Sequence, residues 1–115
     1  MDQEIAETAL EGNYRLEVDR EELLAAIRSI ASFKRQSRTG RLRFSFEGGE
    51  LQLSMPSVEV GMAAQGNWIG AVWVDAKIVW ALAAVPPSGD PVLVTFQKDR
   101  VRIGSTVAKA TSRKS

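Results

Sequence analysis

The fold is decided by residues 72–109, which read VWVDAKIVWALAAVPPSGDPVLVTFQKDRVRIGSTVAK. Apolar and polar residues alternate in several short runs, and this period of two indicates β-strands at 72–75, 92–96, 100–103 and 106–109. Between the first two runs, an apolar segment at 77–82 is followed by a Pro-Pro pair, as expected for a short helix. The segment therefore predicts a strand, a helix and three further strands.

The first half of the chain has the same order of patterns. Strand-like runs occur at 16–19, 42–46, 50–53 and 57–60, and a helix-like run lies at 21–27. A pattern that repeats in this way indicates an internal duplication. We therefore predict an α+β fold made of a duplicated βαβββ unit, with both helices on one side of antiparallel sheets.

The chain length of 115 residues allows one domain, and the 44% hydrophobic composition is sufficient for one core. The predicted domain covers residues 12–112, with repeat one at about 12–65 and repeat two at about 66–112. Residues 1–11 carry only acidic charges and predict a flexible tail, and residues 113–115 predict a frayed end.

Both predicted helices follow an aspartate, Asp19 in the first half and Asp75 in the second. An aspartate carboxylate can accept hydrogen bonds from the free N–H groups of a first helical turn, so we expect both residues to be N-caps. Helical spacing predicts the buried stripes Leu23, Ile27, Ile30 and either Phe33 or Lys34 on the first helix, and Ile78, Leu82 and Val85 on the second. Trp80 fits either the core or an exposed anchor for a partner, whereas Trp68 and Trp73 are expected in the core or at its rim.

The composition argues against catalysis. The chain has no histidine and no cysteine, which removes the commonest general base and the usual zinc ligands. No phosphate-binding glycine-rich loop is present, and Gly48-Gly49 fits a hairpin turn. We expect a protein that is not an enzyme, with no cofactor and no metal, no membrane association and a cytoplasmic location.

One segment is strongly basic although the net charge is only +1. No acidic residue interrupts the run formed by Arg28, Lys34, Arg35, Arg38, Arg41 and Arg43. Such a run is either a solvated face or a surface for a polyanion.

The βαβββ order written twice, Val74-Asp75-Ala76-Lys77 before a short apolar helix closed by Val85-Pro86, and the strands that follow together resemble one domain of a DNA sliding clamp. The resemblance is to the bacterial polymerase III beta clamp and, more distantly, to proliferating cell nuclear antigen. It implies helices that face duplex DNA and edge strands that join neighbouring domains. Six copies of this single domain would supply as many domains as such a ring contains.

The resemblance assigns roles to two sets of residues. The candidates for DNA contact are Arg28, Lys34, Arg35, Arg38, Arg41 and Lys77. The strands at 57–64 and 105–111 are the expected edges, with Val58, Val60, Met62, Val107 and Lys109 as assembly-interface candidates. Charged residues such as Glu59 and Lys109 could instead serve to block edge pairing.

Two functions are therefore expected. The first is a noncatalytic, clamp-like protein that forms a homo-oligomer through its strand edges and binds duplex DNA by phosphate contacts without sequence preference. The alternative is a protein-interaction adaptor with a clamp fold, which binds no DNA and uses Trp80 or an open edge. In either case the resemblance implies a replication or repair protein as partner.

Overall fold

The computed structural model describes residues 14–33 and 40–112. The order strand, helix and three strands occurs twice along this part of the chain. The elements are β1 (Tyr14–Val18), α2 (Arg20–Ala31), β2 (Arg41–Glu47), β3 (Glu50–Met55), β4 (Val58–Trp68), β5 (Val72–Asp75), α4 (Ile78–Ala84), β6 (Val92–Gln97), β7 (Arg100–Ile103) and β8 (Thr106–Thr111). The predicted tail at 1–11 and the end at 113–115 lie outside the described residues.

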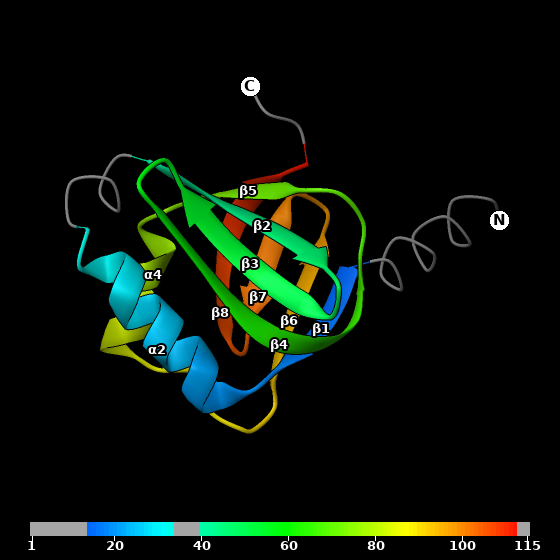
Figure 1. The fold of residues 1–115 in the computed structure, drawn as a ribbon, viewed down its shortest axis with the longest axis horizontal. Coiled ribbons are helices and arrows are strands. Elements are labelled where there is room, and N and C mark those ends of the chain that lie inside the picture. Colours follow the sequence, from blue (N-terminus) through cyan, green and yellow to red (C-terminus); the bar gives the residue numbers. More distant parts are fainter. Residues whose placement is uncertain (1–13, 34–39, 113–115) are drawn as a thin grey trace, which may run out of the picture.

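The strands form one closed antiparallel barrel in the order β1-β4-β3-β2-β5-β8-β7-β6, with β6 also paired to β1 (Figure 1). The pairing pattern repeats with the element order. β1 pairs with β4 and β6, and β5 pairs with β8 and β2 in the same relation. The prediction of a mixed α+β domain is confirmed, and the structure adds that the antiparallel strands close on themselves.

Two strands change partner along their length. β4 pairs with β3 over residues 58–63 and with β1 over residues 64–68. β8 pairs with β7 over residues 106–109 and with β5 only at Ala110 and Thr111. Within the described residues, one edge of segment 58–63 and one edge of segment 106–109 therefore have no strand beside them.

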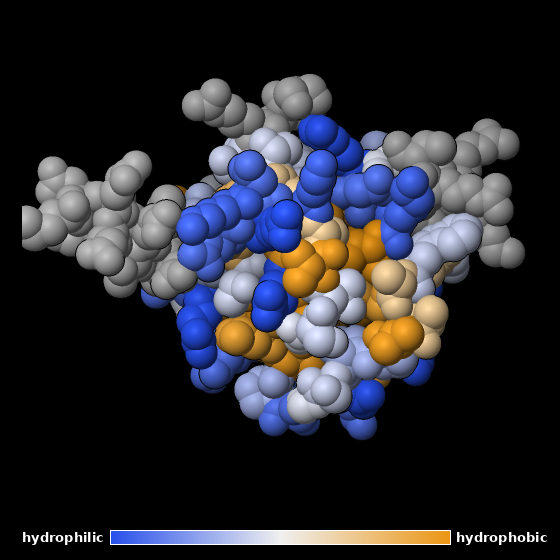
Figure 2. Space-filling model, turned by 180° about the vertical axis from the view of Figure 1, so that it is seen from behind, coloured by the Kyte–Doolittle hydropathy of each residue, from blue (hydrophilic) through white to orange (hydrophobic). Residues whose placement is uncertain are grey.

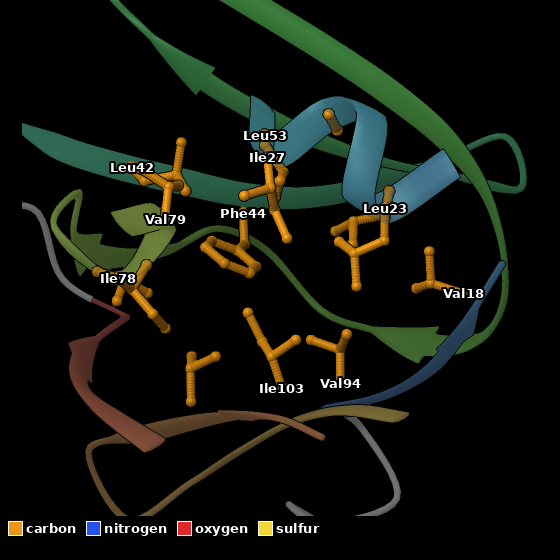
Figure 3. Close-up of a cluster of buried hydrophobic side chains, with 14 of the residues drawn as sticks. Val18, Leu23, Ile27, Leu42, Phe44, Leu53, Ile78, Val79, Val94 and Ile103 are labelled. Carbon is orange, nitrogen blue, oxygen red and sulfur yellow. The ribbon is translucent and has the colours of Figure 1, made fainter. Parts of the chain in front are cut away.

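Alternating side chains fill the barrel from the strands. On β2, Leu42 and Phe44 are buried while Arg41 and Arg43 are exposed, as the period of two predicted. Figure 3 shows side chains of both helices and of strands from both halves of the chain pointing into one core around Phe44. One continuous core is thus shared by the two halves.

The helix α2 agrees with its sequence pattern. The Asp19 carboxylate accepts a hydrogen bond from the backbone N–H of Glu22 at 3.0 Å, so Asp19 is the predicted N-cap. The predicted residues Leu23, Ile27 and Ile30 are all buried. Phe33 lies beyond the last residue of the helix and is exposed.

The helix α4 differs from its prediction at its two ends. Its N-cap is Lys77, so the expectation that Asp75 caps this helix is wrong; the Asp75 carboxylate instead accepts from the backbone N–H of Lys77 at 2.9 Å, one residue before the helix. Ile78 and Leu82 are buried as expected. Val85 is 70% exposed because the helix ends at Ala84, so the expectation that it is buried is also wrong.

The two helices lie side by side on one side of the barrel (Figure 1). α2 packs against α4 and against β4, and α4 approaches β8. Arg20 at the start of α2 donates from Nε to the carbonyl oxygen of Pro87 at 2.9 Å, which ties this helix to the segment between α4 and β6. No helix in the described part of the chain is long and apolar enough to cross a membrane.

The first hairpin of each half turns through two residues with positive φ. Gly48 and Gly49 have φ of 60° and 82° between β2 and β3, whereas Lys98 and Asp99 have φ of 50° and 65° between β6 and β7. Two-residue turns of this kind favour glycine at the second position because residues with a Cβ are strained there. The turn between β6 and β7 therefore carries backbone strain that the glycine turn between β2 and β3 avoids.

We expect Asp99→Gly to stabilise the protein by about 0.5 to 1 kcal/mol, because glycine adopts a φ of 65° without steric cost. Urea unfolding followed by circular dichroism measures the change. The reverse substitution in the first hairpin, Gly49→Asp, should destabilise the protein. A lower unfolding midpoint for Asp99→Gly would show that the aspartate makes a compensating interaction.

Candidate nucleic-acid and assembly surfaces

The structure describes three of the six candidate DNA contacts. Arg28 is exposed in the last turn of α2. Lys77 stands at the start of α4, with its Nζ 3.9 Å from an Asp75 carboxylate oxygen, and both side chains are mostly exposed. Lys34, Arg35 and Arg38 lie outside the described residues.

Arg41 lies on the barrel wall rather than on a helix. It is exposed at the start of β2 and stands directly opposite Asp75 on β5. Arg41 and Lys77 thus flank the same aspartate, which lowers the positive potential that either could present to a phosphate. Arg28 lies on α2, in its last turn.

The described residues of the two helices carry little positive charge. Glu21 and Glu22 in the first turn of α2 are exposed, against Arg28 in the last turn. α4 has no acidic residue in its first turn and no basic residue in its last. Its exposed side is formed by small or aromatic residues, namely Trp80, Ala81, Ala83 and Ala84.

The tryptophans occupy three different environments. Trp80 is 37% exposed and contacts a neighbouring group, so it is a partly covered surface residue. Trp68 is buried against Phe44 and Tyr14, with ring centroids 6.1 Å and 5.4 Å away. Trp73 is half-buried on β5, where the Arg43 guanidinium lies 6.0 Å from its ring centroid.

The assembly candidates lie on segments 58–63 and 106–109, each of which has one edge without a partner among the described residues. Val58 and Val60 on β4 are half-buried, and Val107 and Lys109 on β8 are exposed. Met62 is 1% exposed, so its side chain belongs to the core and only its backbone could join an interface. Between the β4 candidates, Glu59 points outward.

A basic surface that the sequence reasoning missed lies on the outer face of β1, β6, β7 and β8. We call it the basic wall, and it consists of Arg15, Lys98, Arg100, Arg102 and Lys109. Lys98, Arg100 and Arg102 line a shallow hollow of about 530 Å³ together with Thr95, Gln97 and Val107. The alternation of Arg100 and Arg102 with buried Val101 and Ile103 was the available signal.

The far face of the molecule is mixed in polarity. Figure 2 shows hydrophilic side chains over much of its upper part, with apolar side chains exposed between and below them. Within the described ranges, no group of three or more acidic residues could hold a metal ion. The chain matched no protein-family model, no curated protein and no solved structure.

Proposed function

We propose that this chain is a noncatalytic, clamp-like protein that assembles head to tail through the edges of β4 and β8 and associates with duplex DNA through phosphate contacts. The observation that carries the proposal is the change of partner along these two strands. Among the described residues, it leaves one edge of segment 58–63 and one edge of segment 106–109 without a neighbouring strand. An unpaired edge is a template for a strand of another chain.

The charges beside the two edges are complementary. Glu59 projects from β4, and Glu50 on the adjacent β3 is also exposed. Lys109 projects from β8 and stands opposite Arg100 of β7. A contact of β4 with β8 of the next copy would therefore bring an acidic segment beside a basic one.

The helices restrict how such a contact could form. α2 packs against β4 and α4 approaches β8. A strand of another copy can therefore pair with β4 or β8 only along residues that the helices do not cover. A contact that uses two different surfaces on each copy closes into a ring when the rotation between copies allows it. Six copies would match the domain number of a sliding clamp.

The DNA part of the proposal is supported by Arg28 on α2 and Lys77 immediately before α4, two helices that pack against each other. Arginine and lysine bind phosphates without reading sequence, which suits a protein that moves along DNA. Two such residues give weak binding from one copy. An assembly would repeat them, so association and DNA affinity should rise together.

The assembly is tested by reversing its two charges. Glu59→Lys and Lys109→Glu should each weaken self-association by about tenfold, because like charges then meet across the edge. The double variant Glu59→Lys/Lys109→Glu should recover most of the association, since opposite charges face each other again. Analytical ultracentrifugation over a range of protein concentrations, with and without duplex DNA, measures the mass.

The matched control is Glu17→Lys, which reverses one exposed charge on β1, a strand that is paired on both sides at this residue, and should leave the mass unchanged. A monomeric mass for the wild type at high concentration would reject the assembly. If DNA is not bound either, the adaptor function becomes the better explanation. That function is favoured by one observation, the uncharged exposed side of α4 around Trp80.

A further inference from the structure

The basic wall brings together residues that are far apart in the sequence. Arg15 on β1 stands opposite Thr95 on β6, which stands opposite Arg102 on β7. In the next row, Gln97 stands opposite Arg100, which stands opposite Lys109 on β8. Neighbouring strands are about 4.8 Å apart and residues two apart on one strand about 6.7 Å apart, so the charges form a grid.

This arrangement costs stability. Arg100 and Lys109 are directly opposite on one face, and like charges in that position destabilise a sheet. Among the described residues, no hydrogen bond or ion pair engages the guanidinium groups of Arg100 and Arg102. The acidic residues nearest along these strands are Asp99 in the turn and Glu17 on β1. Five basic residues therefore outnumber the acidic ones on this surface.

We propose that the basic wall binds the phosphate backbone of duplex nucleic acid. Charges spread over β1, β7, β8 and the turn between β6 and β7 fit a repeating polyanion better than a single small anion, which needs several donors converging on one point. Thr95 and Gln97 lie between the basic residues and can donate to phosphate oxygens, as uncharged polar side chains do in nucleic-acid interfaces. An anionic membrane would be a poorer fit, because Val107 is the one large apolar side chain among the described residues that line the hollow.

The inference rests on the DNA association proposed above, but not on the assembly. It places the principal contact on the strands, whereas the sliding-clamp resemblance places it on the helices. The charges favour the strands, since exposed Glu21 and Glu22 accompany Arg28 on α2, while α4 carries no charged residue between Ile78 and Ala84.

The test compares full-length variants in binding two duplex DNAs of unrelated sequence, measured by fluorescence anisotropy at several salt concentrations. Arg100→Ala/Arg102→Ala should weaken binding by about tenfold or more on both duplexes. It should also reduce the slope of log affinity against log salt by about 1.8, which is about 0.9 for each phosphate that is no longer bound. Arg100→Lys/Arg102→Lys should retain most of the affinity because the charges remain.

The matched control is Gln52→Glu/Ser54→Glu, which changes the net charge by the same amount from the outer face of β3. It should bind DNA like the wild type, and circular dichroism should show every variant folded. If the alanine pair binds like the wild type while Arg28→Ala/Lys77→Ala does not, the basic wall is rejected and DNA binding by the helices stands. If the wild type binds no DNA at low salt, or binds only phosphatidylserine vesicles, both DNA proposals fail. The assembly proposal is then tested only by the mass of the protein in ultracentrifugation.

Discussion

Replacing Gly66 with alanine should destabilise the barrel by about 3 kcal/mol or more, a large part of the roughly 5 to 15 kcal/mol that usually stabilises a domain. Gly66 lies in β4 with a φ of 134°, a conformation that residues with a side chain rarely adopt. A Cβ at this position would also collide with the carbonyl oxygen of Arg15 on the paired strand β1. Because the atoms it would meet belong to the backbone, a rotamer change cannot relieve the collision.

Gly61→Ala on the same strand is the control. Gly61 has no positive φ, and the nearest atom to its added Cβ is the flexible Glu50 Oε1 at 3.4 Å. Urea unfolding should show a change of less than about 1 kcal/mol for this variant. If Gly66→Ala were as stable as Gly61→Ala, the close pairing of β1 with β4 at Gly66 would be wrong.

The elements could be predicted because each depends on neighbours in the sequence. Alternation on β2 separates buried Phe44 from exposed Arg43, and Asp19 caps α2 through a residue three positions away. The ends of α4 were harder to predict. The Asp75 carboxylate accepts from the backbone N–H of Lys77, so this aspartate belongs to a turn before the helix, and the helix ends at Ala84, which leaves Val85 exposed.

The sequence pattern could not predict that the strands close into a barrel. It depends on pairing between β1 and β6 and between β2 and β5, strands that are far apart in the chain. Alternation determines which face of a strand is buried, but it does not determine which strand lies beside it. The edges of 58–63 and 106–109 that have no partner among the described residues follow from the same long-range pairing, so their extent could not be predicted either.

The candidate surfaces show the same limit. The sequence drew attention to the run from Arg28 to Arg43 because its charges are consecutive. The structure places Arg28 on a helix and Arg41 on the barrel wall, so the described residues of that run come from two different elements. The basic wall was missed because Arg15, Arg102 and Lys109 become neighbours only through strand pairing.

The second large effect is expected at the centre of the core. Phe44 is 1% exposed, and its ring stacks on Trp68 with an interplanar angle of 26°. Figure 3 places it between side chains of both helices and of strands from both halves of the chain. Removing the Phe44 ring would leave a cavity, and several helices and strands would have to move inward to fill it.

Phe44→Ala should therefore cost about 3 to 5 kcal/mol, whereas Phe44→Leu should cost less than about 1.5 kcal/mol because it keeps most of the volume. The matched control is Phe46→Ala on the same strand, where the side chain is only half-buried and the substitution removes less packing. Thermal unfolding followed by near-ultraviolet and far-ultraviolet circular dichroism measures all three variants. If the two halves share one core, both signals should change together at a single lowered midpoint for Phe44→Ala. A separate transition for part of the signal would show that the halves unfold independently, and equal costs at Phe44 and Phe46 would contradict the central position of Phe44.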